Sequence, residues 1–384
     1  MMRSWRVVPA LVLALPLAVA SPAAAERPRL TVTVVEDGLE HPWDVDFLPN
    51  RSMLITERDS RRLLLRTPGG SVRTIFTAPR SMWAGGETGL MSVEVANDFS
   101  TSRAFMTCHG YRKGGTQDVR VVRWRLNQAG TRASYVRTLV SGLPSTSGRH
   151  GGCALVSGSG HQLYIGTGDA AQGRNPQRLT SGGGKVLRVD ARSGRPVASN
   201  PFIRSSSRTK QRVFTYGHRN VQGLARRADG TTWSVEQGSY RDDEVNKLVK
   251  KGNYGWNPVR RAPGDPAYNE GANSPMTDRS LPGVQRGAKW RSGNRTFATS
   301  GAAFVTASSW GDWRGALAVA SLKDTSLRLL RFSPAGTLRG SWKPVALDGT
   351  YGRLRGAVAG PDGALYLTTS NGSNDKILRV TARP

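Results

Sequence analysis

The sequence predicts an all-β chain folded as a six-bladed β-propeller of four-stranded antiparallel blades. First, one pattern recurs six times: an apolar strand, a turn rich in Pro, Asp, Asn and Gly, a second apolar strand and a third. Second, no stretch shows sustained helical periodicity, and 45 Gly and 21 Pro among 384 residues favour tight turns. The alternative is a pair of β-sandwiches. It is less favoured, because sandwiches do not repeat one hairpin signature six times.

The clearest copy of the pattern is the last one. Residues 361–363, Pro-Asp-Gly, join two runs of alternating apolar residues, and residues 376–380 supply the next strand. The other copies cover residues 47–56, 93–107, 155–189, 224–235 and 304–332. One blade cannot bury both of its faces alone, so we expect the copies to stack radially into a single domain over residues 26–384.

Two stretches interrupt the pattern. Residues 191–212 and 257–297 contain few apolar residues and many Pro, Gly, Ser and Arg. We expect both to be long loops rather than interdomain linkers, because the strand pattern continues on either side. In a propeller, such loops usually build the rim of the central funnel.

Residues 1–25 have the three parts of a secretory signal peptide. Arg3 and Arg6 form a basic start, residues 7–20 are apolar, and residues 23–25 are all Ala. Cleavage is expected before Glu26, and the alternative is a disordered or anchoring N-terminus. The apolar run is too short to span a membrane, and no later stretch approaches the required length. The sequence therefore predicts a secreted or cell-envelope protein.

Export places the two cysteines in an oxidising compartment. Cys108 and Cys153 are an even pair, which fits one disulfide. Two thiols alone are a poor metal site, so a disulfide is the favoured interpretation.

The charge balance is strongly basic. With 55 Lys and Arg against 27 Asp and Glu, the formal net charge is +28, which suggests nucleic-acid binding. Export and the scattered arginines, without a lysine-rich tail, weaken that interpretation. We expect no specific nucleic-acid partner. The charge more simply describes a surface that tolerates anionic cell-envelope polymers.

Three segments are dense in groups that could carry chemistry. The first contains His150 before one strand of a hairpin and Asp169 after the next, so the open end of the hairpin would make them neighbours. A carboxylate beside an imidazole fixes its tautomer and raises its basicity, as a general base requires. A purely structural hydrogen-bonded pair is the alternative.

The second and third segments suggest anion and cation binding. Residues 216–224 place Arg219 and two amides just before a strand, where a guanidinium could stabilise an oxyanion or anionic cofactor; a surface turn is the alternative. Residues 236–246 and 252–256 combine carboxylates with exposed carbonyls, which suit calcium. The EF-hand spacing is absent, and a solvated acidic turn is the alternative.

Taken in order, these segments resemble the soluble quinoprotein glucose/sorbosone dehydrogenases, also called aldose sugar dehydrogenases. The resemblance extends from about Leu39 to Arg379 and includes residues 184–190 and the last hairpin. Members of that family are six-bladed propellers that bind pyrroloquinoline quinone (PQQ) and calcium. The resemblance implies oxidation of an aldose at the anomeric carbon to a lactone, with transfer of electrons to an external acceptor.

The resemblance also implies a role for each matching residue. His150 corresponds to the general base, Asp169 to its supporting carboxylate and Arg219 to the arginine near the reacting quinone carbonyl. Further cofactor contacts are implied at Glu87, Asn220, Lys323, Arg353 and Arg355. Carbonyls of Gly238 and Ser239 are implied as ligands of the catalytic calcium, and Glu244 and Tyr254 as positions linked to a structural calcium.

Four positions depart from the family pattern. The family usually has Arg at Cys153 and Asp at Gly356, often has Pro at Ser239, and has a polar or acidic residue at Arg149 in some members. We interpret Cys153 as the disulfide partner of Cys108, joining adjacent blades. Three other functions remain possible alongside the dehydrogenase: a non-catalytic propeller that binds a glycan or protein, a calcium-dependent lactonase, and heparin-like binding through net charge.

Overall fold

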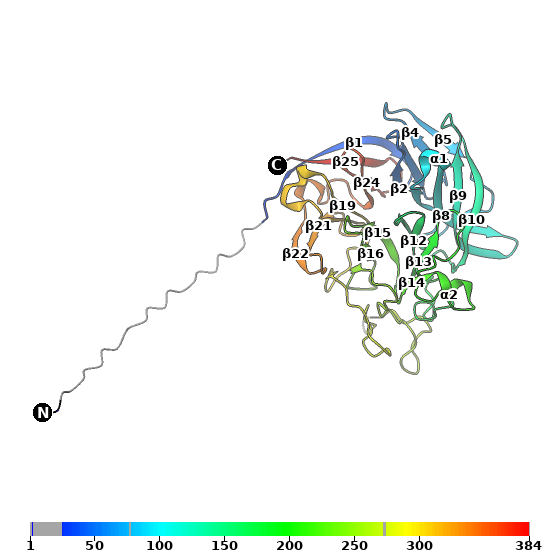
Figure 1. Cartoon of the computed structure of the whole chain (residues 1–384), viewed down its shortest axis with the longest axis vertical. Coiled ribbons are helices and arrows are strands. Elements are labelled where there is room, and N and C mark those ends of the chain that lie inside the picture. Colours follow the sequence, from blue (N-terminus) through cyan, green and yellow to red (C-terminus); the bar gives the residue numbers. More distant parts are fainter. Residues whose placement is uncertain (1, 3–24, 77, 272–273, 384) are drawn as a thin grey trace.

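The computed structural model describes residues 2, 25–76, 78–271 and 274–383, and these residues form six antiparallel sheets. The predicted six-bladed β-propeller is therefore confirmed (Figure 1). The proposed leader, residues 1–25, lies almost entirely outside the described residues.

Each sheet is one blade, and the strands of each blade are listed from the strand nearest the axis outward. Blade I contains β2 (Pro42–Phe47), β3 (Met53–Glu57), β4 (Leu63–Arg66) and β5 (Val72–Phe76). Blade II contains β7 (Leu90–Val95), β8 (Ala104–Lys113), β9 (Thr116–Leu126) and β10 (Ala133–Leu143), with β6 (Met82–Trp83) added to β8. Blade III contains β11 (Gly152–Ser157), β12 (Gln162–Thr167), β13 (Lys185–Asp190) and β14 (Val213–Tyr216).

The remaining three blades follow the same order. Blade IV contains β15 (Val221–Arg226), β16 (Thr232–Glu236), β17 (Glu244–Lys247) and β18 (Trp290–Arg291). Blade V contains β19 (Thr299–Phe304), β20 (Leu317–Ser321), β21 (Leu327–Phe332) and β22 (Leu338–Trp342). Blade VI contains β23 (Leu354–Ala359), β24 (Leu365–Thr369), β25 (Asp375–Arg383) and β1 (Arg29–Leu39).

The blades close into a ring. Each innermost strand contacts the innermost strand of the next blade, and β23 of blade VI contacts β2 of blade I. The outer strand of blade VI comes from the other end of the chain, because β1 pairs antiparallel with β25 from Arg29↔Arg383 to Leu39↔Asp375. This closing strand was not predicted from the sequence, where the repeat was traced only from residue 47.

The expected turns and loops are mostly present. The Pro-Asp-Gly hairpin joins β23 to β24, with Gly363 at a positive φ of 78° that the turn requires. The two stretches expected to be long loops also contain short regular elements, α2 (Arg208–Arg212) and β18. The other helical segments of the described chain are α1 (Phe99–Ser102), η1 (Ser308–Trp313) and η2 (Val345–Leu347).

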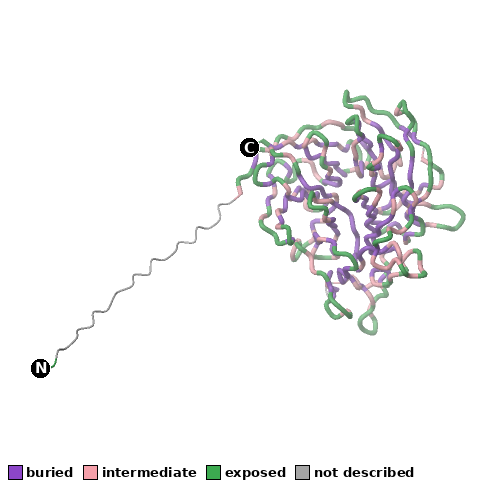
Figure 2. The backbone as a smooth tube through the Cα atoms, viewed as in Figure 1, coloured by how far each residue is buried: buried purple, intermediate pink, exposed green. Residues whose placement is uncertain are grey.

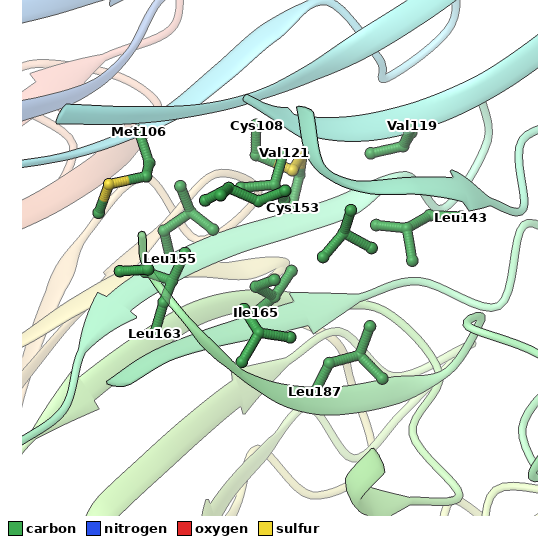
Figure 3. Close-up of a cluster of buried hydrophobic side chains, with 14 of the residues drawn as sticks. Met106, Cys108, Val119, Val121, Leu143, Cys153, Leu155, Leu163, Ile165 and Leu187 are labelled. Carbon is green, nitrogen blue, oxygen red and sulfur yellow. A yellow bond between two sulfur atoms is a disulfide. The ribbon is translucent and has the colours of Figure 1, made fainter. Parts of the chain in front are cut away.

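The buried residues lie between neighbouring sheets, while exposed residues concentrate in the outer loops (Figure 2). Blades II and III share a cluster that includes Leu155, Ile165 and Leu187 (Figure 3). Within it, Cys108 of β8 and Cys153 of β11 form a disulfide with their Cα atoms 5.7 Å apart. The predicted Cys108–Cys153 disulfide between two adjacent blades is therefore confirmed.

Candidate active site

The topology brings the predicted site residues to one rim of the ring. The innermost strand of each blade leaves this rim and the second strand returns to it, so residues just before the former and just after the latter share one face. The residues before innermost strands are Glu87, His150, Arg219, Asn220 and Arg353, and those after second strands are Asp169, Gly238, Ser239 and Lys323.

His150 and Asp169 form a buried pair at the centre of this arrangement. His150 Nδ1 lies 2.8 Å from Asp169 Oδ1, and the side chains are 3% and 0% exposed. The pairing of β11 with β12 from Gly152↔Thr167 brings the two segments together. Close approach requires Gly168, because a Cβ there would collide with the carbonyl oxygen of His150. The expected proximity of the two side chains is thus observed.

Asp169 is fixed by donors from three directions besides His150. Trp256 Nε1 and the Tyr268 hydroxyl each donate to Asp169 Oδ2 at 2.8 Å, and the backbone N–H of Ala171 donates to Oδ1 at 2.8 Å. The carboxylate therefore has little freedom to rotate away from the imidazole. Tyr268 also lies 3.2 Å from His150 Nδ1 and covers the pair from the long loop.

The imidazole of His150 is held in its neutral form at neutral pH. Burial lowers the pKa of His150, the hydrogen bond to Asp169 opposes that shift, and the charge of Arg219 adds to it. Donation from Nδ1 to the carboxylate selects the tautomer in which Nε2 carries the lone pair. This is the protonation state that a general base requires.

Arg219 lies 5% exposed beside the pair. Its Nη2 forms an ion pair with Glu270 Oε2 at 2.8 Å, and its Nη1 donates to the carbonyl of Gln237 at 3.1 Å. Nε is buried and has no hydrogen-bond partner among the described residues. Arg149, a departure from the family pattern, contacts the other oxygen of the same Glu270 carboxylate.

Glu87 and Asn220 connect the His150 segment to the neighbouring blade. The backbone N–H of His150 donates to Glu87 Oε2 at 3.0 Å, and Asn220 Nδ2 lies 3.4 Å from that oxygen. Asn220 Oδ1 accepts from the backbone N–H of Gly152 and from Gln222 Nε2. These contacts fix the position of the His150 backbone.

The three other predicted cations differ in their surroundings. Arg355 is 7% exposed; its Nη1 donates to Gln222 Oε1 at 2.7 Å and to Ser300 Oγ at 3.1 Å, and its Nε has no partner among the described residues. Its guanidinium carbon lies 3.8 Å from the centre of the Trp43 ring, and burial lowers the pKa of Arg355 to about 9. Lys323 and Arg353 are exposed on the rim. Lys323 Nζ donates to Thr296 Oγ1, and Arg353 Nε donates to the carbonyl of Ser370.

The predicted cation ligands lie in two places. Gly238 and Ser239 form a turn after β16, where the backbone N–H of Gly238 donates to Asp243 Oδ1 at 2.8 Å. Asp243 is fully buried and also accepts from the backbone N–H of Phe297, so this turn is anchored from below. The carbonyl oxygens of such a turn are donors of the kind that calcium prefers.

Glu244 and Tyr254, the positions that the resemblance links to a structural calcium, contact protein groups. Arg291 Nε lies 3.3 Å from Glu244 Oε1, and the Tyr254 hydroxyl donates to the carbonyl of Lys247 at 2.6 Å. Burial, and then the charge of Glu236, raise the pKa of Glu244 to about 8. Among the described residues, no group of three or more His, Cys, Asp or Glu is arranged to hold a metal.

Three residues at the site were not predicted to act there: Trp256, Tyr268 and Glu270. Tyr268 and Glu270 belong to the stretch 257–297, whose composition predicted only a loop at the rim. Their sequence neighbourhood has no distinguishing pattern, and only the folded path of the loop brings them onto Asp169 and Arg219. Trp256 lay in a segment proposed for calcium, whereas its indole supports the carboxylate.

A cavity of about 260 Å³ lies along the propeller axis below the site. Trp43, Gln222 and Arg355 line it, as do the carboxylates of Asp44, Asp46 and Glu94. Burial raises the pKa of Asp44 to about 7 and that of Glu94 to about 8. The carboxylates also link blades, since the backbone N–H groups of Val95 and Ser157 donate to Asp46 and Glu94.

The site thus combines a buried His–Asp pair with buried arginines at one rim of a six-bladed propeller. This combination is typical of a propeller that binds a ligand and carries out acid–base chemistry. The model of the Glucose / Sorbosone dehydrogenase family matches residues 39–379. The chain therefore belongs to the glucose/sorbosone dehydrogenase family, which confirms the resemblance seen in the sequence.

Individual relatives agree with this assignment. The chain is 29% identical over 371 residues to the aldose sugar dehydrogenase YliI of Escherichia coli K12, covering 92% of this chain and 93% of the relative. A putative oxidoreductase (glucose dehydrogenase) from Thermus thermophilus shares its fold with a TM-score of 0.76 at 32% identity, covering 92% and 100% of the two chains. The PQQ-bound aldose sugar dehydrogenase of Streptomyces coelicolor matches with a TM-score of 0.73 at 25% identity, covering 94% and 100%.

Proposed function

We propose that this protein is a PQQ- and calcium-dependent dehydrogenase that oxidises an aldose at the anomeric carbon to its lactone. The observation that carries the proposal is the His150–Asp169 pair, buried beside Arg219 in a member of this family. A relative of the same fold was solved with PQQ bound, which supports the same cofactor here.

In this proposal, His150 Nε2 takes the proton of the anomeric hydroxyl. Asp169 keeps Nδ1 protonated and stabilises the imidazolium that forms, while Trp256 and Tyr268 hold the carboxylate in place. Burial keeps the base deprotonated at neutral pH. When bound, the quinone supplies the two-electron acceptor of the oxidation, and electrons then pass to an external acceptor.

The residues present fit an anionic quinone. Arg219 and Arg355 are buried guanidinium groups, and each has an Nε atom without a partner among the described residues. An organic polyanion would satisfy both the charges and the unpaired donors. Lys323 and Arg353 at the rim, with Glu87 and Asn220 beside His150, would complete the contacts. Carbonyl oxygens of Gly238 and Ser239 would hold the calcium ion.

We further propose that the protein is exported and that residues 1–25 are its signal peptide. The Cys108–Cys153 disulfide is consistent with an oxidising compartment. Among the described residues, no helix is long and apolar enough to cross a membrane. The net charge of +28 would favour association with anionic polymers of the cell envelope.

A reconstitution assay tests the proposed activity. Purified protein is loaded with PQQ and calcium, and reduction of a dye acceptor is followed across a panel of aldoses. We expect turnover with at least one aldose, loss of turnover in His150→Ala, and normal folding of that variant by circular dichroism. Cofactor binding without turnover on any aldose would instead favour a binding propeller.

A further inference from the structure

Lys185, the first residue of β13, is a buried cation that the proposed chemistry does not use. Its side chain is 0% exposed, although lysine is among the residues least often buried completely. Its ammonium group donates to three backbone carbonyls: Asn175 and Gly183 at 2.6 Å each, and Pro176 at 3.0 Å. All three donors of the ammonium group are therefore matched by acceptors.

The three carbonyls belong to the loop that connects β12 to β13, residues 168–184. This loop forms no strand, and its shape depends on turn hydrogen bonds within the loop and on side-chain contacts. Without the ammonium group, three buried carbonyl oxygens would face one another without a donor, which is costly. Lys185 therefore does for this loop what a bound metal ion does for other loops rich in carbonyl ligands.

Two residues of this loop connect the Lys185 ammonium group to Asp169. Asn175, whose carbonyl accepts from Lys185, donates through Nδ2 to the carbonyl of Asp169 at 2.9 Å. Gln177 donates to the carbonyl of Trp256 at 2.9 Å, and the Trp256 indole holds the Asp169 carboxylate. The charge of Asp169 acts on Lys185 in return, since it opposes the effect of burial, which lowers the pKa of Lys185 to about 7.

The same loop reaches the Arg219 segment. The carbonyl of Pro176, which accepts from Lys185, also accepts from the backbone N–H of Gly217 at 3.0 Å. The backbone N–H of His218 donates to the carbonyl of Gly184, the residue before Lys185, at 3.2 Å. The carbonyls bound by the Lys185 ammonium group thus belong to residues that contact both the Asp169 segment and the Arg219 segment.

We propose that Lys185 is a positioning residue whose ammonium group gathers the 168–184 loop and so fixes Asp169 behind His150. The activity readout of this inference rests on the proposed function, but its structural readout does not. The proton in the hydrogen bond between His150 Nδ1 and Asp169 should give a downfield proton NMR signal in the protein without cofactor, and its loss in His150→Gln would assign it.

Two variants and a rescue test the inference. Lys185→Met keeps the length of the side chain without its charge, and we expect it to shift or abolish the His150 signal. Lys185→Ala removes the atoms of propylammonium, so added propylammonium should restore the signal while 1-propanol should not. In the loaded enzyme, kcat should fall about 10- to 100-fold with little change in KM, because misplaced catalytic groups cost rate.

The matched control is Lys247→Met, since Lys247 Nζ donates to the carbonyl of Pro334, away from the 168–184 loop. This variant should leave the His150 signal unchanged. An unchanged signal in both Lys185 variants would overturn the inference, and so would misfolding of both variants if propylammonium does not recover Lys185→Ala. If the wild-type protein oxidises no sugar, the proposed function fails while the NMR experiment still decides the role of Lys185.

Discussion

At the residue scale, Asp169 is the carboxylate that holds the proposed base in place. It accepts four hydrogen bonds, from His150, Trp256, Tyr268 and the backbone of Ala171. Only one of these involves the proposed base, and the other three prevent the carboxylate from turning away. In the proposed mechanism, the rate of proton removal would therefore depend on the position of Asp169 as well as on His150.

Replacing this carboxylate by an amide tests its contribution. In Asp169→Asn the amide can present N–H rather than oxygen to Nδ1, which favours the wrong imidazole tautomer. We expect kcat to fall about 100-fold or more, as in other His–Asp pairs. Steady-state kinetics of the loaded enzyme measures the effect, with thermal unfolding as the control for folding. A loss of less than about threefold would contradict the assigned role.

Glu270 neutralises Arg219, a group that the proposed cofactor would contact. An anionic ligand at Arg219 must displace this carboxylate or bind against its repulsion. We therefore expect Glu270→Gln to bind PQQ several-fold more tightly than the wild type, measured by absorbance titration. Asp37→Asn is the matched control for net charge, since Asp37 is exposed on β1, the outermost strand of blade VI. Weaker binding in Glu270→Gln would show that the carboxylate helps to hold the ligand.

At the scale of elements, the disulfide joins blades II and III within a buried apolar cluster. Cys108 and Cys153 are 0% and 1% exposed and 45 residues apart in sequence. Closing a loop of this length stabilises a fold by about 4 kcal/mol in the chain-entropy model. The contact also lies three residues after His150, so it anchors the strand that follows the proposed base.

Removing the disulfide should lower stability without changing the fold. We expect Cys108→Ala with Cys153→Ala to unfold at a lower temperature, with a loss of about 2–4 kcal/mol. Differential scanning calorimetry with and without a reductant measures this loss. The reductant should lower the Tm of the wild type and leave the Tm of the double variant unchanged. Equal effects on both proteins would contradict a disulfide in solution.

The sequence predicted strands and hairpins better than loops. Alternating apolar residues and Pro-Asp-Gly turns report local geometry, so the hairpin of β23 and β24 could be recognised directly. The neighbourhood of His150 and Asp169 followed from antiparallel pairing alone. Tyr268 and Glu270 could not be predicted, because their contacts depend on the path of a long loop that has no periodic pattern.

On the scale of the whole molecule, ring closure joins the two ends of the chain. The pairing of β1 with β25 completes blade VI, and no local pattern in the sequence announces it. The pairing depends on two strands at opposite ends of the chain, which only the closed ring brings together. The repeated hairpin pattern predicted the fold class and the family resemblance agreed with it, yet the resemblance began at about Leu39 and left this strand unassigned.

The axial carboxylates make stability depend on pH. Glu94 has a pKa raised to about 8 by burial and by the charge of Asp46. A carboxyl group with a raised folded pKa contributes stability at low pH that is lost as pH rises from its unfolded pKa, about 4.5, towards 8. The contribution of Glu94 to the stability of the wild type should therefore be smaller at pH 8 than at pH 5.

Glu94→Gln removes that dependence while an amide oxygen still accepts from the backbone N–H of Ser157. Relative to the wild type, the variant should gain on the order of 1–3 kcal/mol in unfolding free energy between pH 5 and pH 8. Urea unfolding at the two pH values measures the difference, with the comparison at pH 5 as the internal control. The same difference at both pH values would contradict a raised pKa.

The central claim is that this rim binds a quinone and removes a proton from a sugar through His150. Spectral titration of the purified chain with PQQ in the presence of calcium, followed by one addition of aldose, tests it most directly. The account predicts saturable binding, reduction of the bound quinone in the wild type, and binding without reduction in His150→Gln. Absence of binding, or reduction at the wild-type rate in His150→Gln, would contradict it.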